Sequence, residues 1–507
     1  MDRLFQIDVV VSGVLVLLTI LTGRIVWNIT LSPLARQRIP GPAAAVATEL
    51  WYQWHGVRMD RTMAIDKLFK TYGPVVRIGP NRVAFIDSEA VHKLHRLLPF
   101  NKAEFLTKMT FGGGPNTAST SDPTLHAKFR RWHAPALRGV RLRETAVILV
   151  QQMEDLISRL TADGSQAGGI DVLHLMNLHT LDMLGLALFD AKFDQVKTGR
   201  ELPFVKDSAD WLLDFLTRTS LPPAIYGMLK LIPLKRLREI FSADDSICQF
   251  AAKLYDETPD KPTGSENINM IAAGKWYRDP VTGEAPTKQE VISDMGIFLV
   301  AGTDTNAIAL TFACYHLARQ PRLYENLRDE LRSANMLDNP YEIDVLRELP
   351  YLNAFVKEVL RSHSPAGLFE RVVPKGGIVL AGYTLPEGTV VGASAYTSGL
   401  REDLFPDAKT VNPERWLMNV NGMWIQRHDI PLDEMNAACH PFSLGLRACP
   451  GRPLAEIETV LTITTVVRNF RVRLHESTTE DSMSPVDLGV IPPKAHRCLL
   501  HFELNPL

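Results

Sequence analysis

A short segment near the C-terminal end of the chain combines a cysteine with glycines, a proline and an arginine. It runs from Phe442 to Gly451 and reads FSLGLRACPG. Cys449 precedes Pro450, which favours the first turn of a helix, and a cysteine at a helix N-terminus has a lowered pKa. Gly445 and Gly451 permit tight turns, so backbone amides can approach the sulfur and the chain can approach a flat group closely. The segment therefore predicts a thiolate that can serve as a ligand to iron.

The remaining cysteines do not suggest a competing use. The chain has five cysteines, an odd and scattered set, which does not predict a disulfide framework. Few cysteines fit a reducing compartment, where an unusual one is better explained as a metal ligand or a nucleophile. Cys439 and His440 are adjacent, but no second pair has the spacing of a zinc site.

One long apolar helix can be placed between residues 287 and 320. Thr287 and Glu290 form a capping box at its start, and Gln320-Pro321 ends it. The helix is apolar on all sides, which predicts a central and buried position. Polar residues interrupt it once, at Gly302–Asn306. Because a buried carboxylate is costly and glycine weakens a helix, this local conflict predicts a functional site there.

The cysteine segment resembles the heme-binding loop of the cytochrome P450 family, whose pattern is F-x-x-G-x-R-x-C-x-G. All five fixed positions match. The resemblance implies a heme (protoporphyrin IX iron) whose axial metal ligand is Cys449. It also implies cofactor contacts by Phe442, Gly445 and Gly451, with Arg447 beside an anionic heme propionate.

The polar stretch in the long helix resembles the family's oxygen-activation motif, [AG]-G-x-[DE]-T-[TS]. The resemblance places Ala301 and Gly302 against the heme and makes Asp304 and Thr305 the catalytic pair that delivers protons for oxygen activation. Asn306 departs from the usual threonine or serine. Because its side chain can still donate and accept hydrogen bonds, we expect altered water structure rather than lost activity.

Two further stretches resemble the family's E-x-x-R and P-E-R-[FW] motifs, at Glu358–Arg361 and Pro413–Trp416. The resemblance implies a buried, structural ion network of Glu358, Arg361 and Arg415. A carboxylate between two guanidinium groups keeps the buried charges compensated. Glu325–Arg328 fits the first pattern too, and is expected to be an exposed helix face.

Three more residues are expected to hold the heme propionates. His126 and Arg130 stand where the family has W-x-x-x-R, and residues four apart share a helix face. Histidine replaces the tryptophan and keeps a donor. Arg371 matches the family's other propionate-binding arginine, although Glu370 before it stands where many relatives have proline, which puts the strand entry there in doubt.

The N-terminus predicts a membrane anchor. Residues 8–27 are almost uniformly apolar, and about 20 such residues suffice to cross a bilayer. The stretch from Val9 to Gly23 carries no charge. Arg24, Arg36 and Arg38 follow this stretch and only Arg3 precedes it, which predicts that the rest of the chain lies in the cytoplasm. A cleaved signal peptide is the alternative, but no clear cleavage site is present.

The rest of the chain predicts one large, mainly helical domain. Hairpin patterns occur at residues 75–86 and 377–391, and most other segments have helical periodicity. The predicted organisation is an anchor over residues 1–30 and a catalytic domain over residues 31–507. The resemblance implies the cytochrome P450 fold, with a small, antiparallel-rich β region. A net charge of −2 gives no indication of nucleic-acid binding.

The resemblance implies a monooxygenase that inserts one oxygen atom of O2 into an apolar small molecule. No nucleotide-binding G-x-G-x-x-G motif is evident, so electrons are expected from NADPH through a cytochrome P450 reductase, with cytochrome b5 as a further partner. The sequence is similar to filamentous-fungal members at the endoplasmic reticulum membrane that act in secondary metabolism, such as terpenoid or polyketide pathways. A heme-thiolate isomerase or dehydratase and a non-catalytic heme sensor or carrier remain alternatives.

Overall fold

The computed structural model describes residues 2–505 apart from 98–99, 138, 260–267 and 431. Its helices are α1 (Asp2–Val26), α2 (Pro33–Arg36), α3 (Ala43–Ala47), α4 (Leu50–Val57), α5 (Arg61–Tyr72), α6 (Ser88–His92), α7 (Glu104–Thr107), α8 (Pro123–His133), α9 (Gly139–Asp163), α10 (Val172–Leu184), α11 (Gln195–Thr198), α12 (Pro203–Ser220), α13 (Pro223–Lys230), α14 (Lys235–Glu257), α15 (Met270–Trp276), α16 (Lys288–Arg319), α17 (Pro321–Ser333), α18 (Ile343–Leu346), α19 (Pro350–Ser362), α20 (Ala395–Gly399), α21 (Asp433–Ala438) and α22 (Arg452–Asn469). Its strands are β1 (Val75–Gly79), β2 (Arg82–Phe85), β3 (Asn101–Lys102), β4 (Ile170–Asp171), β5 (Phe369–Val372), β6 (Ile378–Leu380), β7 (Tyr383–Leu385), β8 (Val390–Ala393), β9 (Leu417–Val420), β10 (Met423–Gln426), β11 (Phe470–Leu474) and β12 (Leu499–Leu504).

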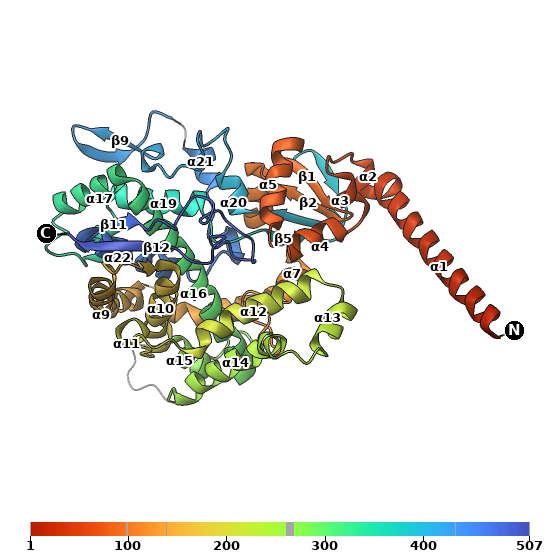
Figure 1. Cartoon of the computed structure of the whole chain (residues 1–507), viewed down its shortest axis with the longest axis horizontal. Helices are drawn as coiled ribbons and strands as arrows, with labels where there is room; N and C mark the ends of the chain where they lie inside the picture. Colours follow the sequence, from red (N-terminus) through yellow and green to blue (C-terminus); the bar gives the residue numbers. More distant parts are fainter. Residues whose placement is uncertain (1, 98–99, 138, 260–267, 431, 506–507) are drawn as a thin grey trace.

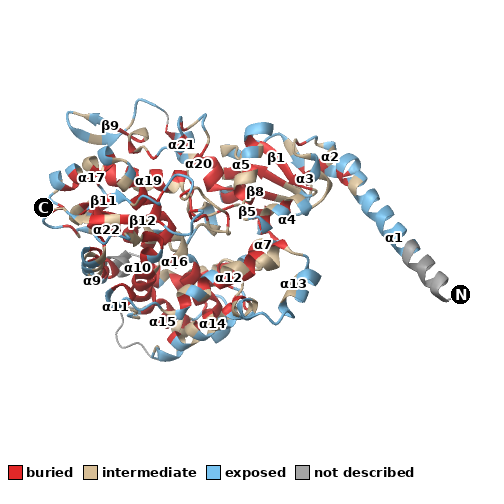
Figure 2. Cartoon of the chain, in the orientation of Figure 1, coloured by how far each residue is buried: buried red, intermediate tan, exposed pale blue. Residues whose placement is uncertain are grey.

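A large helical body and a smaller lobe built on a sheet make up the globular part of the chain (Figure 1). The lobe contains β1, β2 and β8 with α3, α4 and α5 around them, and α1 projects away from it. Figure 2 shows buried residues concentrated along the helices in the middle of the body and in the strands of the lobe. The expected mainly helical architecture with small sheets is confirmed.

The largest sheet has the strand order β1-β2-β8-β5-β3. All its neighbouring strands are antiparallel except β2 and β8, so the β region is rich in antiparallel pairs as expected. The hairpin predicted at residues 75–86 is present as β1 and β2. The second predicted hairpin is wrong in its extent, because only β6 and β7 form it, while β8 leaves it to join the large sheet beside β2 and β5.

The predicted long helix is α16, which runs without a break for 32 residues, about 48 Å at 1.5 Å per residue. Its N-terminus carries the predicted capping box between Thr287 and Glu290. The hydroxyls of Thr303 and Thr305 donate to the carbonyls four residues earlier, at 2.8 and 2.7 Å. A Cβ at Gly302 would lie 3.0 Å from the Leu184 side chain, so glycine lets α10 pack closely against the middle of α16.

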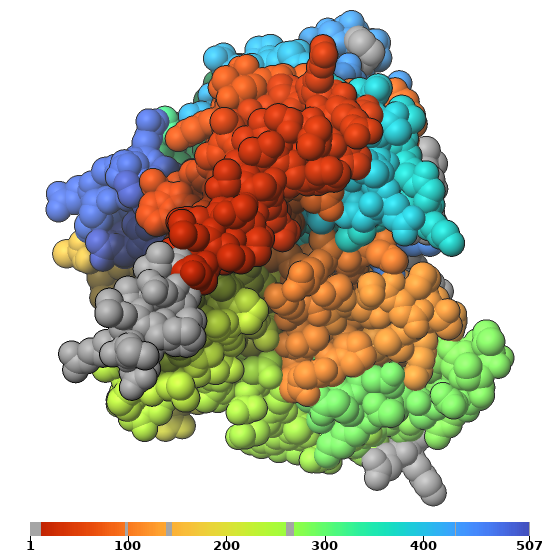
Figure 3. Space-filling model, turned by 90° about the vertical axis from the view of Figure 1, so that its right-hand side faces the viewer, coloured from red at the N-terminus to blue at the C-terminus, as the bar shows by residue number. Residues whose placement is uncertain are grey.

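The apolar N-terminal helix α1 extends away from the body, and none of its apolar window is buried inside the structure. Figure 3, which views the molecule from this side, shows the helix projecting over the face of the lobe. Two other helical segments, 172–189 and 288–319, are long and apolar enough to cross a membrane, but 89% and 78% of their apolar windows are buried. Their apolar surface therefore belongs to the core of the protein.

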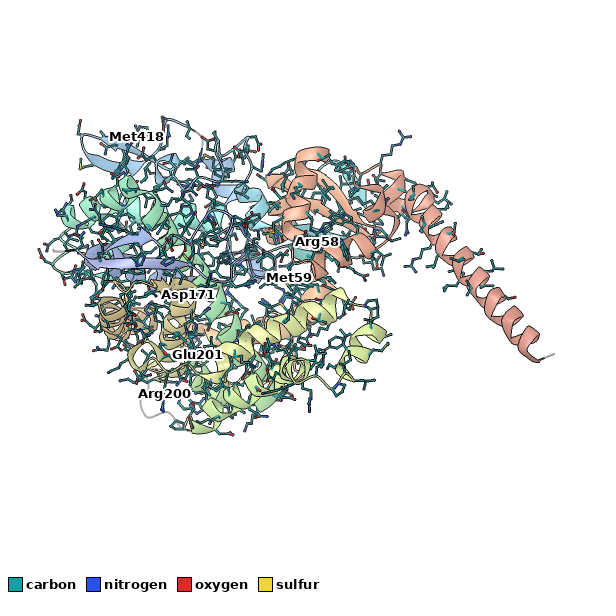
Figure 4. The ribbon with its side chains drawn as sticks, in the orientation of Figure 1. Arg58, Met59, Asp171, Arg200, Glu201 and Met418 are labelled. Atoms are coloured by element: carbon teal, nitrogen blue, oxygen red, sulfur yellow. The ribbon has the colours of Figure 1, made fainter. Side chains whose placement is uncertain are left out.

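The lobe and the helical body meet near Met59, which Figure 4 labels at this junction. The amide of Asp487 donates to the Met59 carbonyl at 2.7 Å. The carboxylate of Asp487 accepts from the amide and the hydroxyl of Thr62, at 2.8 and 2.6 Å. A loop close to the C-terminus is thereby fixed to the N-terminal lobe.

Candidate active site

The cysteine segment forms a tight loop that leads directly into α22. The Cys449 amide donates to the Phe442 carbonyl at 2.9 Å, which closes the loop. Gly445 has a φ of 70°, and a Cβ there would lie 2.5 Å from the carbonyl oxygen of His95. Glycine is therefore required at this position for two reasons, its left-handed backbone and its close approach to another segment.

Cys449 is exposed although protein atoms surround its sulfur closely, so the thiol is accessible within a crowded site. Burial raises the pKa of this thiol. The backbone amides of Gly451 and Arg452 and the charge of Arg130 oppose that rise. The loop therefore aims two N–H dipoles at the sulfur, which favours the ionised form as a ligand.

The oxygen-side residues lie on α16, where Ala301 is exposed although Val300 and Thr303 on the same helix are buried. An exposed alanine in the middle of a buried helix marks an internal space beside it. The Thr305 hydroxyl donates to the Ala301 carbonyl, so Thr305 lies one helical turn after Ala301.

The Asp304 side chain points toward α12, where Ser208 donates to its carboxylate at 3.2 Å. Burial raises the pKa of Asp304 to about 6, and the Ser208 hydrogen bond opposes this rise. Among the described residues, no basic side chain forms an ion pair with this carboxylate. Asp304 can therefore gain or lose a proton near neutral pH, which suits a proton relay.

A group of basic side chains gathers beside the cysteine loop. We call Lys102, His126, Arg371 and Arg447 the basic cluster. Lys102 on β3 and Arg371 on β5 are direct cross-strand partners, an arrangement that is unfavourable for like charges. Lys102 donates to the carbonyls of Thr117 and Ala118, and Arg447 donates to the carbonyls of Thr120 and Ser121.

The carboxylates nearest the basic cluster act on it only from beyond ion-pair distance, Asp294 on Lys102 and Asp122 on Arg447. Among the described residues, no carboxylate forms an ion pair with Lys102, Arg371 or Arg447. Burial and the neighbouring arginines hold the pKa of Lys102 well below its usual range. Burial, with Arg447 nearby, lowers the pKa of Arg371 to about 10. Burial and the charges of Arg447 and Lys102 lower the pKa of His126 to about 3, so its ring is neutral.

These features together fit a heme. An accessible thiol supplies a ligand for iron, and the exposed Ala301 marks space beside α16 for a flat group. The basic cluster, which has no carboxylate in ion-pair contact among the described residues, matches two anionic propionates, whose charge would offset its positive charge. Arg130, four residues after His126 on α8, donates to the Ala448 carbonyl at 3.3 Å and so also contacts the cysteine loop.

The Glu358 network lies at a different place and is fully formed. Arg361 makes a two-point contact with Glu358 at 2.7 and 2.9 Å, and Arg415 lies 3.4 Å from the same carboxylate. Trp416 adds a donor at 2.8 Å. Glu358 and Arg361 have no exposed side-chain surface, so this network is buried structure and not a site of proton exchange with solvent.

Two expectations about the other motif residues need correction or refinement. Arg328 is buried and donates to the carbonyls of Val467 and Arg468, so Glu325–Arg328 is not simply an exposed helix face. Glu325 pairs with Arg471 at the surface as expected. Glu370 is buried and forms an ion pair with Arg82 at 2.8 Å, which shows how β5 accepts a carboxylate at the position of the usual proline.

Sequence reasoning missed Lys102, Ser208 and Trp416. Lys102 and Ser208 carry no motif of their own, because only strand pairing and helix packing bring them to the site. Trp416 belongs to the P-E-R-[FW] motif, and its indole N–H was a signal that a buried acceptor lies nearby.

The cytochrome P450 family model matches residues 40–499 of this sequence. The chain belongs to the cytochrome P450 family. It is 29% identical to the cytochrome P450 monooxygenase cypX of Dothistroma septosporum, over 92% of this chain and 90% of the relative. It is 26% identical to the pisatin demethylase of Fusarium vanettenii, over 90% of this chain and 89% of that enzyme.

The fold is similar to that of a cytochrome P450 known from a crystal structure. The TM-score is 0.71 at 20% identity, over 88% of this chain and 98% of the other. The predicted family and fold, and the enzyme class of cytochrome P450 monooxygenase, are therefore confirmed.

Proposed function

We propose that this chain binds heme through Cys449 and oxidises an apolar small molecule with O2, using electrons that originate from NADPH. The observation that carries the proposal is an accessible thiol with a basic cluster beside it that forms no ion pair with a carboxylate among the described residues. The bound heme supplies the iron at which dioxygen is activated. The protein residues hold this group, orient the substrate and move protons.

In this proposal each residue group has a separate role. Phe442, Gly445 and Gly451 shape the loop that presents the thiolate. The basic cluster, with Arg130, binds the propionates. Ala301 borders the space beside α16 and Gly302 lets α10 pack against that helix, while Asp304 exchanges protons and passes them toward Thr305.

The proposed electron donor is a membrane-bound NADPH-cytochrome P450 reductase, with cytochrome b5 as a second donor. The cysteine loop presents Leu446 to solvent with 86% of its surface exposed. Arg347 and Arg452, both substantially exposed, flank Glu456 at the start of α22. The exposed Leu446 and Arg452, which follows Cys449 by three residues, support an acidic partner surface.

We place the protein in the endoplasmic reticulum membrane, with residues 1–30 as a single-pass anchor and residues 31–507 as the cytoplasmic catalytic domain. Helix α13 supports a second contact with the bilayer, because it has no buried residue and exposes Met228 and, just beyond it, Leu231. Figures 1 and 3 show this region on the same side of the molecule as α1.

The proposed substrate is an apolar fungal secondary metabolite such as a terpenoid or a polyketide. This proposal rests on fungal relatives such as cypX and tazI, the latter from Aspergillus terreus. A heme-thiolate isomerase or a heme carrier would have no use for the proton-exchanging Asp304. That residue therefore favours the monooxygenase over both alternatives.

The test is spectroscopy of the full-length protein followed by oxygen uptake. The reduced CO complex is expected to show the red-shifted Soret band of thiolate ligation, and Cys449→Ser is expected to lose it. With reductase and NADPH, candidate apolar metabolites should stimulate oxygen consumption. A band at the histidine-ligated position would overturn the thiolate assignment, and NADPH-independent isomerisation of a substrate would favour the isomerase.

A further inference from the structure

A buried hydrogen-bonded bridge connects the two helices that flank the candidate heme site. The Asn306 amide on α16 donates to the Glu458 carboxyl on α22 at 2.7 Å. The Thr459 hydroxyl on α22 lies 2.9 Å from the Asn306 side-chain oxygen and 2.6 Å from the Ala455 carbonyl, so its single proton is shared between these two acceptors. Asn306, Glu458 and Thr459 are at most 6% exposed. One side chain of α16 therefore makes two contacts with α22.

The position of the bridge relates it to the candidate chemistry. Asn306 directly follows Thr305, and α22 begins three residues after Cys449. The helix that carries the oxygen-side residues is thereby joined to the helix that follows the thiolate. Displacement of one helix relative to the other would change the separation between Thr305 and Cys449, on which oxygen activation depends.

The residue type at 306 determines whether this bridge can form. An asparagine side chain has a donor, its amide nitrogen, and a separate acceptor, its carbonyl oxygen, so it can bond to two different residues at once. The threonine or serine of the family pattern offers one hydroxyl on a shorter side chain. Asn306, which departs from the family pattern, thus has a specific structural use in this chain.

Glu458 depends on Asn306 because it has few other partners. Its second carboxyl oxygen, Oε1, is buried without a hydrogen-bond partner among the described residues. Burial raises the pKa of Glu458 to about 8, and the Asn306 hydrogen bond opposes that rise. Loss of the amide would leave the buried carboxyl with neither of its oxygens bonded, which is a costly arrangement.

We propose that Asn306 is a positioning residue whose amide, through Glu458 and Thr459, holds α16 against α22 and so fixes the position of Thr305 relative to the cysteine loop. This inference rests on the proposed heme-thiolate function. It assigns no chemical step to Asn306 itself. Its effect is exerted through the placement of Thr305.

The test compares Asn306→Ala, Glu458→Gln and Glu458→Leu with the parent enzyme in its heme-bound, full-length form. The first measurement is the C–O stretching frequency of the reduced CO complex, which senses the distal surroundings without turnover. The second is product formed per NADPH consumed. Asn306→Ala and Glu458→Leu should shift and broaden the C–O band and lower coupling roughly threefold to tenfold.

Glu458→Gln should remain close to the parent, because a glutamine carbonyl still accepts from Asn306. The Asn306→Ala/Glu458→Leu double variant should be no worse than either single variant, since both remove the same bridge. Thr311→Ala is the matched control. Its buried hydroxyl bonds only within α16, to the Ala307 carbonyl at 2.7 Å, so the C–O band and coupling should not move.

The outcomes separate this inference from the proposed function. If the parent lacks the thiolate-type Soret band, the proposed function fails. If the parent shows that band but Asn306→Ala and Thr311→Ala give the same C–O band and coupling, the bridge does not position Thr305. Additive effects in the double variant would likewise overturn the proposal.

Discussion

The Glu358 network and the basic cluster are both buried and both rich in arginine, yet their charge balance is opposite. In the Glu358 network, one carboxylate lies between Arg361 and Arg415 and also accepts from Trp416. In the basic cluster, Lys102 and Arg371 face each other across two strands with no carboxylate between them. The first region is complete within the chain. In the second, no carboxylate among the described residues forms an ion pair with Lys102, Arg371 or Arg447, and only Asp294 and Asp122 act on it from a longer distance.

This difference separates a structural ion network from a binding site. Removing a partner from a complete buried network leaves an uncompensated charge and destabilises the fold. Removing a cation from a cluster with excess positive charge relieves repulsion in the heme-free protein. Such a substitution weakens only the heme-bound form. The two regions should therefore respond oppositely to similar substitutions.

The largest effect is expected for Glu358→Ala, which leaves two buried guanidinium groups without their carboxylate. The loss of stability should be about 3–5 kcal/mol, enough to abolish or sharply reduce folded protein. Thermal unfolding and the yield of soluble protein measure it. Glu325→Ala is the matched control, because Glu325 belongs to the same E-x-x-R pattern but pairs with Arg471 at the surface. Equal stability of the two variants would contradict the structural role of the network.

Substitution in the basic cluster should weaken heme retention and leave the heme-free fold intact. Arg371→Met and Arg447→Met are each expected to weaken heme binding about tenfold to a hundredfold, as a buried charged hydrogen bond is lost. Heme transfer to apomyoglobin gives the rate of loss. Heme dimethyl ester, which has no propionate charge, supplies the control, since its binding should be nearly unchanged by these variants. Equal weakening for both cofactors would exclude a propionate contact.

The pKa of Asp304 predicts a pH-dependent gain in stability on substitution. Because this pKa is raised from 3.8 to about 6, the folded state binds more protons than the unfolded state between these values. The free energy of unfolding therefore falls, through Asp304, as the pH rises from about 4 to 6. Above that range the full destabilisation is present. Asp304→Asn should raise the stability by up to about 3 kcal/mol at pH 7 and by little at pH 4. Denaturant unfolding at both values checks this, and an equal gain at both would contradict it.

The smallest effect concerns Ser208, whose hydroxyl lowers the Asp304 pKa against burial. Ser208→Ala should move that pKa upward, so the pH profile of coupled turnover shifts to higher pH. Thr219→Ala on the same helix is the control, because its hydroxyl bonds only within α12. An unchanged profile in Ser208→Ala would show that Asp304 does not set the pH dependence.

Local motifs predicted much of the site because their chemistry depends on neighbouring residues in sequence. The capping box at Thr287, the glycine at 445 and the Glu358–Arg361 pair are all short-range features, and each is formed in the structure. The second hairpin was predicted with the wrong extent, because pairing of β8 with β2 joins residues some 300 apart. No local pattern carries that pairing.

The sequence by itself determined the thiolate loop, the central helix and its polar interruption, because these are set by residue types at fixed spacing. Only the tertiary structure decided that Lys102 faces Arg371, that Ser208 donates to Asp304, and that Asn306 bridges to Glu458. Each of these contacts joins separate elements, and its energy depends on burial and on the absence of other partners. Those conditions arise only when the chain has folded.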